Sequence, residues 1–314
     1  MTIMETRKVG SLEVSLAGLG CNNFGMRIDE DASQAVVDAA LDAGVNHFDT
    51  ADIYGGGKSE EFLGRALAAR REDVVITTKV GMGVPEGMHG GSRDYVLSRC
   101  DASLQRLGTD HIDLYLLHQP DLTTPIGETL EAFGELIRTG KVREIGCSNF
   151  SAAQLDEAAS AARDLGVPGF VNAQNDYSLL NREVEAEVLP AVDRLAMTFM
   201  PYFPLASGVL TGKYKRGEEH PEGSRLAAWG NMAGEFASDA RMAVVERLDE
   251  YAAAHGHTLA ELALSWLATN PVVGSVIAGA TKPEQIRANA AATVAWKLTA
   301  EERAEVDAIA RVEG

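Results

Sequence analysis

The stretch FDTADIYGGGKSEEFLGRAL, from Phe48 to Leu67, passes from an apolar strand end through a polar, glycine-rich turn into a helix. Glycines 55–57 allow a tight turn, because glycine adopts backbone conformations that other residues avoid. The helix is expected to begin near Ser59. A strand followed directly by a helix is therefore the unit to look for in the rest of the chain.

Apolar or β-branched runs of strand length recur along the chain, and stretches with helical spacing separate them. After the third run, Leu97, Cys100, Leu104 and Leu107 fall on one helical face, and Gly108 stands where a helix ends. The runs number eight: SLAGLGC (15–21), VNHFDT (45–50), VVITTKV (74–80), HIDLYLLH (111–118), VREIGCS (142–148), FVNAQND (170–176), MTFMPYF (197–203) and GSVIAGA (274–280).

Residue types typical of helix ends occur between these runs. Gly44, Gly140 and Gly166 are expected to end three other helices, and Asp31 and Ser151 are candidate N-caps. The chain is thus a repeat of strand and helix.

This pattern predicts an α/β fold of the (β/α)8 TIM barrel type. Near-continuous apolar strands separated by helices indicate parallel strands that are buried on both faces, and eight units close a barrel. A doubly wound sheet is less favoured because no GxGxxG follows the first run. RKVGSLEVS (7–15) is expected to form a β-hairpin that closes the barrel bottom. Residues 1–314 are interpreted as one domain, in which 214–238 is long enough to be a functional loop or lid.

The composition disfavours some classes of partner. The chain has 28 basic and 46 acidic residues and a formal charge of −18, which argues against nucleic acid and anionic lipid. Neither a signal peptide nor a run approaching the roughly 18 apolar residues of a membrane span is found, so a cytoplasmic protein is expected. Cys21, Cys100 and Cys147 are too scattered for a disulfide framework or a zinc site.

Polar residues gather at the C-terminal ends of the expected strands. In a barrel these ends share one rim, which is the face that carries active sites. Four ionisable residues there suit proton transfer: Asp49, Tyr54, Lys79 and His118. The polar strand ends are Cys21-Asn22-Asn23, Asp49-Thr50, Lys79, His118-Gln119, Ser148-Asn149, Gln174-Asn175, Tyr202 and Thr281-Lys282.

Each of the four residues alone also fits an ordinary role, such as a helix cap or a hydrogen-bonded structural histidine. Together they favour chemistry, because burial of VVITTK would place the Lys79 ammonium in or near the barrel mouth. A buried ammonium needs a partner, which Asp49 can supply. The Lys79 charge near Tyr54 would favour the phenolate and lower the phenol pKa from about 10.

Other strand ends suit a nucleotide. SNFS (148–151) and QND (174–176) offer amide and hydroxyl groups to a flat, hydrogen-bonding ring, and Tyr202 could stack on it. AGATKPEQIRANAA (278–291) places Lys282 beside a helix that opens at Pro283, which would make a backbone anion site. An ordinary loop explains this last stretch about equally well.

Seven segments form an ordered set along the chain: FDTADIYGGGKSEEFLGRAL (48–67), VVITTKVG (74–81), SLQRLGTDHIDLYLLHQPD (103–121), GKVREIGCSNFS (140–151), NAQNDYSLLNR (172–182), PYFPLASGVLTGKY (201–214) and VIAGATKPEQIRAN (276–289). This set resembles the aldo-keto reductases, in the bacterial-type branch with a Gly-Ala-Thr or Gly-Ala-Ser cofactor motif. The resemblance implies a barrel that binds NADPH without a Rossmann fold and reduces aldehydes or ketones, or runs in reverse, for example in sugar oxidation. It also implies the catalytic tetrad Asp49, Tyr54, Lys79 and His118, with the tyrosine as general acid.

The same resemblance implies residues that hold the cofactor. Many members have Pro-Lys-Ser before the last helix and an arginine on it, where this chain has Ala278-Gly279-Ala280 and Gln285. NADPH is therefore expected, with Lys282 and Arg287 left to meet the phosphate, and NADH is left open. The implied cofactor residues are Asp49, Ser148, Asn149, Gln174, Tyr202, Leu205, Ser207, Gly208, Leu210, Lys213, Gly279, Thr281, Lys282, Gln285 and Asn289.

Two other functions compete with the reductase. Relatives of this family serve as channel-associated subunits with the tetrad retained, so a cofactor-binding regulatory or sensor subunit is one alternative. A metal-dependent barrel enzyme is disfavoured because only Asp49 and His118 offer ligands at strand ends. The expected partner is a small-molecule carbonyl or sugar substrate, but neither the identity of this substrate nor the oligomeric state follows from the sequence. The expected substrate pocket consists of Asn22, Asn23, Phe24, Tyr54, Met82, His118 and Gln119.

Overall fold

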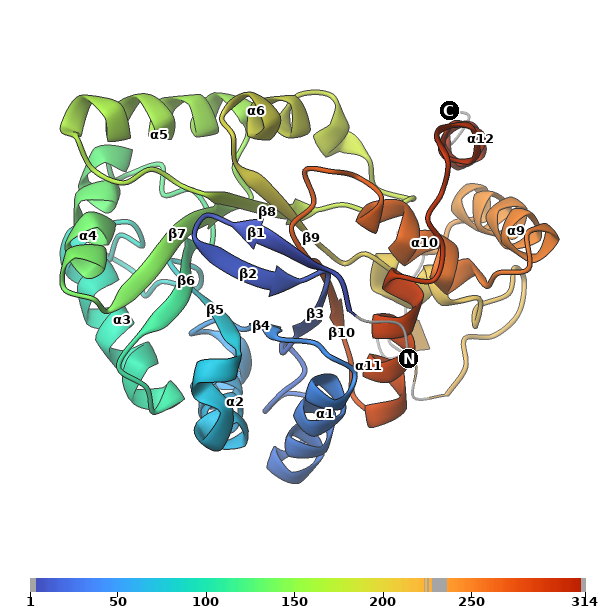
Figure 1. The fold of residues 1–314 in the computed structure, drawn as a ribbon, viewed down its shortest axis with the longest axis horizontal. Helices are drawn as coiled ribbons and strands as arrows, with labels where there is room; N and C mark the ends of the chain where they lie inside the picture. Colours follow the sequence, from blue (N-terminus) through green and yellow to red (C-terminus); the bar gives the residue numbers. More distant parts are fainter. Residues whose placement is uncertain (1–3, 223, 225, 228–235, 312–314) are drawn as a thin grey trace.

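A computed structural model describes residues 4–222, 224, 226–227 and 236–311. Eight parallel strands form a (β/α)8 barrel with helices around it, as the repeat predicted (Figure 1). Each expected run contains one barrel strand: β3 (Ala17–Gly20), β4 (His47–Asp49), β5 (Val75–Val80), β6 (Ile112–Leu117), β7 (Val142–Ser148), β8 (Asn172–Asp176), β9 (Thr198–Tyr202) and β10 (Val276–Gly279).

The strands are ordered β10-β3-β4-β5-β6-β7-β8-β9, and every neighbouring pair is parallel. A bridge between Phe199 of β9 and Val273, just before β10, brings the two edges together. All eight strands therefore end at the same rim of the barrel.

A hairpin of β1 (Thr6–Val9) and β2 (Leu12–Ser15) crosses the opposite end of the barrel, as predicted (Figure 1). Its Val9, Leu12 and Val14 form a buried cluster with barrel residues that include Leu114 and Met200. The hairpin thus closes the bottom of the barrel with apolar side chains, and the other rim carries the polar strand ends.

Helices cover the outside of the barrel and bury their apolar faces against it. They are α1 (Glu30–Asp42), α2 (Lys58–Leu67), α3 (Arg93–Leu107), α4 (Ile126–Arg138), α5 (Ala152–Leu165), α6 (Val188–Arg194), α9 (Asp239–Ala254), α10 (Leu259–Ala268), α11 (Pro283–Thr293) and α12 (Ala300–Ala310). The 3-10 helices are η1 (Tyr54–Gly57), η2 (Ala68–Asp73), η3 (Glu183–Glu185) and η4 (Ala206–Thr211).

The helix caps agree with the sequence at Ser151, which forms a capping box with Gln154. The prediction of Asp31 as an N-cap is wrong. Helix α1 begins two residues earlier, and Asp29 accepts a hydrogen bond from the Ala32 amide at 3.0 Å. Asp31 lies in the first turn, where its charge still favours the helix dipole.

The predicted lid, 214–238, falls partly outside the described residues, at 223, 225 and 228–235. Among its described residues, Tyr214 and Leu226 are buried, and the Tyr214 hydroxyl accepts a hydrogen bond from the Leu226 amide at 3.3 Å. Ser224 lines the cavity at the polar rim that is described below. These parts of the segment therefore lie against the barrel.

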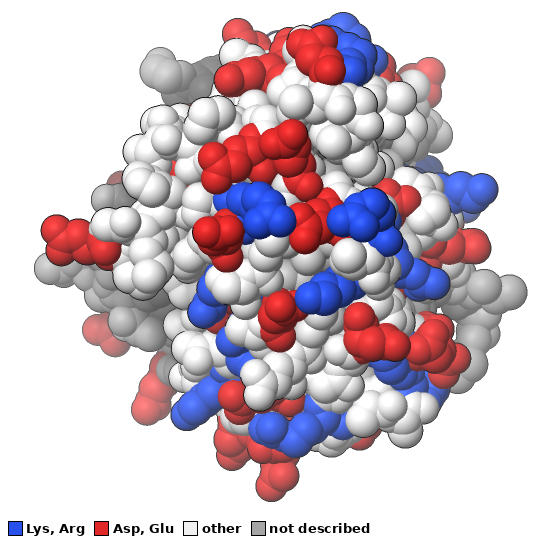
Figure 2. Space-filling view, turned by 90° about the vertical axis from the view of Figure 1, so that its left-hand side faces the viewer, with Lys and Arg blue, Asp and Glu red and all other residues white. Residues whose placement is uncertain are grey.

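Basic and acidic side chains intermingle on the face that α3, α4 and α5 form (Figure 2). Arg93 of α3 pairs with Glu135 of α4, and Lys141, which precedes β7, lies 2.5 Å from Asp101 of α3, so charges on neighbouring elements offset one another. Within the described part of the chain, no helix is both long enough and apolar enough to cross a bilayer.

Candidate active site

A buried ion pair lies at the centre of the polar rim. The Lys79 ammonium, at the end of β5, donates to Asp49 Oδ1 at 2.6 Å and to the Thr50 carbonyl at 2.8 Å. Gln174 from β8 donates to the other Asp49 oxygen at 2.9 Å. Burial alone lowers the pKa of Lys79, but the adjacent Asp49 carboxylate reverses this and the net pKa is raised. Lys79 is therefore a fixed positive charge inside the barrel mouth.

Tyr54 reaches this ion pair from η1, the short turn between β4 and α2. Its ring centroid lies 5.2 Å from the Lys79 ammonium and 5.7 Å from the His118 ring. Gly55 and Gly57 have φ values of +60° and +96°, and a Cβ at Gly55 would lie 2.8 Å from the Phe24 carbonyl oxygen. The glycines are thus required for the turn that brings Tyr54 to the rim.

Two ion pairs, which the sequence analysis missed, hold the ends of this turn against α3. Arg99 donates to Asp52 at 2.9 Å, and Arg106 donates to Glu60 at 2.6 Å. Both carboxylates are buried, and Glu60 also accepts from Thr78 at 2.6 Å. The second oxygen of Asp52 has no partner among the described residues, and burial raises the pKa of this carboxyl.

The predicted direction of the Tyr54 pKa is wrong. Burial of the phenol raises its pKa, and this effect outweighs the lowering by the Lys79 charge. Tyr54 therefore keeps its proton at neutral pH in the structure as it stands. A protonated phenol next to a fixed cation can donate its proton and leave a phenolate that the cation stabilises.

His118, which follows β6, is held in its neutral form. Burial, and to a smaller extent the Lys79 charge, lowers its pKa to about 3. Its backbone amide donates to the Val80 carbonyl at 2.8 Å, and its carbonyl accepts from Asn149 at 2.9 Å. The Nδ1 atom is buried without a partner among the described residues. A neutral imidazole in this state can offer an N–H from Nε2 to a substrate oxygen.

A cavity of about 470 Å³ opens over these residues. Of the tetrad, Asp49, Tyr54 and His118 line it, and Lys79 lies beneath as a fully buried residue. The predicted site residues that line it are Asn22, Asn23, Asp49, Tyr54, Met82, His118, Ser148, Asn149, Gln174, Tyr202, Leu205, Ser207, Gly208, Lys213, Gly279, Thr281, Gln285 and Asn289.

Besides Lys79, four predicted site residues do not line this cavity. Phe24 and Leu210 have no exposed surface and belong to the hydrophobic core, because loop residues of this kind pack inward when they are apolar. Gln119 is half-buried outside the cavity, and Lys282 is exposed at the start of α11. Lining residues that the sequence analysis missed are Gly20, Arg27, Phe203, Pro204, Thr211, Ser224, Ile277, Ala278 and Ala280.

The backbone beside β9 has an unusual shape. Phe203, Ala206 and Ser207 have φ values of 51°, 45° and 58° although they are not glycine, and Gly208 follows at 94°. The Ser207 hydroxyl is buried without a partner among the described residues. The amides of Ala206 and Gly208 donate to the carbonyls of Phe203 and Leu205 at 2.8 Å, which holds the turn in this shape. Ser207 and Gly208 line the cavity.

The wall of the cavity beside the ends of β7, β8 and β9 is also preorganised. Asn149 has a φ of 64°, and the Tyr202 hydroxyl donates to its side-chain oxygen at 2.7 Å. Ser148, Asn149 and Gln174 come from adjacent strands and place hydrogen-bonding groups on one wall. Such a wall fits a carboxamide.

Among the described residues, no three His, Cys, Asp or Glu side chains are grouped so that they could hold a metal.

A barrel with a buried Lys–Asp pair, and with a tyrosine and a histidine that line a cavity at the same rim, has the groups that proton transfer to a bound molecule needs. The model of the Aldo/keto reductase family matches residues 17–311. The chain belongs to the aldo/keto reductase family.

Individual relatives agree with this assignment. The chain is 40% identical over 274 residues to a probable voltage-gated potassium channel subunit beta of Oryza sativa subsp. japonica, covering 85% of this chain and 83% of that protein. It is 33% identical over 320 residues to the L-glyceraldehyde 3-phosphate reductase of Escherichia coli O157:H7, covering 97% and 92%.

A solved structure has the same fold. The holo form of aldo-keto reductase AKR11C1 from Bacillus halodurans matches with a TM-score of 0.79 and 33% identity, covering 98% of this chain and 97% of that one.

Proposed function

We propose that the protein is an NADPH-dependent aldo-keto reductase that converts aldehydes or ketones to alcohols, reversibly. The observation that carries this proposal is the Lys79–Asp49 pair at 2.6 Å beneath a protonated Tyr54 on the cavity wall. It provides a proton donor whose conjugate base is stabilised in place. Family members typically use nicotinamide cofactors, and the structural neighbour is a holo form, which supports this type of cofactor.

The residues have distinct roles in this reaction. The chemistry that NADPH would supply, when held by the cavity residues, is a hydride for the carbonyl carbon. Tyr54 gives its proton to the oxygen that becomes the alcohol, and the Lys79 charge stabilises the phenolate that remains. His118, neutral at physiological pH, donates a hydrogen bond to the same oxygen and so fixes its position between the two side chains.

The cavity residues divide along the expected cofactor. Ser148, Asn149, Gln174 and Tyr202 would hold the nicotinamide end, and Leu205, Ser207, Gly208 and Lys213 would hold the pyrophosphate. Gly279, Thr281, Gln285 and Asn289 would hold the adenosine end. Arg27 and Lys213 are the cations among the described lining residues, and both favour a phosphate-bearing cofactor.

The test follows NADPH absorbance after addition of aromatic, aliphatic and sugar aldehydes, with Tyr54→Phe beside the wild type. We expect kcat to fall roughly 10²–10⁴-fold in the variant, because a general acid typically contributes that much. Cofactor affinity, measured by fluorescence titration, should change little. Near-normal turnover in Tyr54→Phe would refute the mechanism.

A second candidate function is a cofactor-binding regulatory subunit with little turnover. The observation that favours it is the identity of 40% and 38% to two plant proteins described as probable voltage-gated potassium channel subunits beta. NADPH binding without turnover of any carbonyl, or of any alcohol in reverse, would select this function over the reductase.

A further inference from the structure

A second cavity, which we call the side cavity, lies between α3, the loop after β5 and the turn that carries Tyr54. It has a volume of about 830 Å³, and its lining residues fall within 52–56 and 82–106. Small-molecule sites in proteins typically have volumes of roughly 300–1,000 Å³. The side cavity is therefore large enough to hold a ligand of its own.

The side cavity is separate from the active-site cavity. Among the described residues, only Met82 lines both. Beside it, Ile53 packs so closely on Gly83 that a Cβ at Gly83 would collide with the Ile53 side chain. The side cavity continues along α3 as far as Arg106. A molecule bound there would leave the active-site cavity free.

One polar atom of the residues that line the side cavity has no partner. The Asp52 side chain is only 2% exposed, and one of its oxygens, Oδ2, accepts from Arg99 at 2.9 Å. The other oxygen, Oδ1, has no hydrogen-bond partner among the described residues. A buried carboxylate oxygen without a donor costs free energy, so an N–H or O–H group of a ligand is favoured beside it.

The remaining lining of the side cavity is largely apolar and open. Ile53 is 37% exposed and Met88 is 58% exposed, which is high for large apolar side chains, and Tyr95 lines the cavity from α3. Gly56 and Gly87 also line it, and a Cβ at either would meet nothing within 4 Å. Apolar side chains and bare backbone offer a surface that the flat face of an aromatic ring can cover.

The charges around the side cavity indicate a neutral ligand. Two acidic residues, Asp52 and Asp94, and two basic residues, Arg99 and Arg106, line it. Arg99 pairs with Asp52, and Arg106 pairs with the buried Glu60 at 2.6 Å. An ionic ligand would have to give up its water without finding a free opposite charge.

We propose that the side cavity is a second ligand site, which binds neutral aromatic molecules that carry a hydroxyl or amino group. The rings lie against Ile53, Met88 and Tyr95, and the O–H or N–H group donates to Asp52 Oδ1. Asp52, Ile53 and Gly56 belong to the segment that carries Tyr54, so the bound molecule contacts this segment from outside the active-site cavity.

The test compares 2-naphthol with 2-methoxynaphthalene, which has the same rings but no donor. We expect calorimetric titration of the full chain to show about fivefold tighter binding of 2-naphthol, because a hydrogen bond to a carboxylate outweighs burial of one more methyl group. In Asp52→Asn, which can still accept from Arg99 but loses the second acceptor, the difference should fall below about twofold. Equal affinities of the wild type for the two compounds would overturn the proposal.

Further variants locate the ligand. Ser98→Trp places a large ring in the side cavity from the exposed Ser98 of α3 and should weaken 2-naphthol binding about tenfold. Met88→Asp places a charge in its apolar wall and should act similarly, which keeps the test valid if Ser98→Trp does not fold. Asn22→Trp in the active-site cavity and Glu131→Trp on the exposed side of α4 should leave the affinity unchanged.

The outcomes do not depend on turnover, so they leave the reductase function untouched. Loss of 2-naphthol binding in Asn22→Trp together with its retention in both side-cavity variants would place the ligand in the active-site cavity and overturn the proposal. Absence of binding to the wild type would overturn it as well.

Discussion

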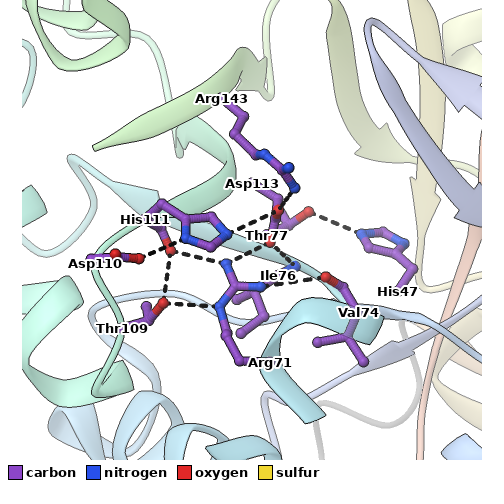
Figure 3. A network of polar contacts seen from close by, with 10 residues as sticks. All are labelled: His47, Arg71, Val74, Ile76, Thr77, Thr109, Asp110, His111, Asp113 and Arg143. Carbon is purple, nitrogen blue, oxygen red and sulfur yellow. Dashed lines mark hydrogen bonds and ion pairs between the residues drawn. The ribbon is translucent and has the colours of Figure 1, made fainter. Parts of the chain in front are cut away.

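Two buried carboxylates lie at opposite ends of the same barrel. Asp49 ends β4 at the catalytic rim, and Asp113 is the second residue of β6, near the hairpin-covered end. Asp113 accepts from Arg71 and Arg143 at 2.7 and 2.8 Å and from the Ile76 amide at 2.9 Å (Figure 3). Both of its oxygens are satisfied by the protein alone.

Other polar side chains near the hairpin-covered end of the barrel also have hydrogen-bond partners. Arg71 also donates to the carbonyls of Val74 and His111, and one ring nitrogen of His47 bonds the Thr77 hydroxyl (Figure 3). The other ring nitrogen of His47 bonds the Ser275 hydroxyl. At the rim, by contrast, His118 Nδ1 and the Ser207 hydroxyl have no partner among the described residues. A saturated buried network stabilises a fold, whereas polar atoms that stay unpaired at residues lining a cavity are typical of a functional site.

The strongest test of this comparison is Asp113→Asn. Removing the negative charge leaves two arginines without their buried partner, and we expect a loss of about 3–5 kcal/mol in the free energy of unfolding. The kcat of the folded enzyme should stay within about twofold, the reverse of the pattern for Tyr54→Phe. Urea unfolding followed by circular dichroism, together with aldehyde turnover, measures both quantities.

Asp110→Asn is the matched control, because Asp110 contacts the same His111 but its side chain is 95% exposed. It should change stability little. If Asp113→Asn abolished turnover and left the free energy of unfolding unchanged, the assignment of stability to the hairpin-covered end and of catalysis to the rim would be wrong.

A smaller effect is expected from His47→Gln, and it concerns how the free energy of unfolding changes with pH. Burial lowers the pKa of His47 to about 4 from its ordinary value of 6.5. The unfolded chain therefore takes up a proton below pH 6.5 that the folded protein refuses until about pH 4, and stability falls as the pH falls through this window. For one such histidine the loss between pH 7.5 and pH 5 is about 2 kcal/mol.

Glutamine does not titrate, so His47→Gln should lose about 2 kcal/mol less than the wild type over this range. His118 contributes in the same direction, while Asp176, whose pKa burial raises to about 6, acts in the opposite one. The contributions of His118 and Asp176 are the same in both proteins, so they cancel when urea unfolding of the variant is compared with that of the wild type. His255→Gln is the control for loss of an exposed imidazole. An unchanged pH dependence would show that His47 is not held neutral.

The smallest effect is expected from Arg7→Ala in the hairpin. Arg7 donates to the carbonyls of Ala268, Asn270 and Val273 at 2.7, 2.9 and 2.6 Å, at the C-terminal end of α10. Its loss should lower the free energy of unfolding by about 1 kcal/mol, because water can replace the donor at this partly exposed position. Lys8→Ala, on the same strand, is the control in the same unfolding assay. A change in kcat would contradict the structural role of this end.

The sequence by itself determined the barrel, the hairpin and the catalytic rim. Strand and helix periodicities are local, and eight repeats admit few closed arrangements, so the strand ends had to meet at one rim. Asp49, Tyr54, Lys79 and His118 could be placed together on this basis alone. The start of α1 was missed because Asp29 and Asp31 are both acceptable caps, and only backbone geometry distinguishes them.

The tertiary structure decided what surrounds these residues. Phe24 and Leu210 proved to be core residues, and Arg27 and Phe203 proved to line the cavity, because loop conformation determines which side a residue faces. The direction of the Tyr54 pKa depended on a balance between burial and the Lys79 charge. The pairs Arg99–Asp52 and Arg106–Glu60 join segments about 46 or 47 residues apart. Burial and long-range contacts are properties of the packed chain, so no local sequence pattern contains them.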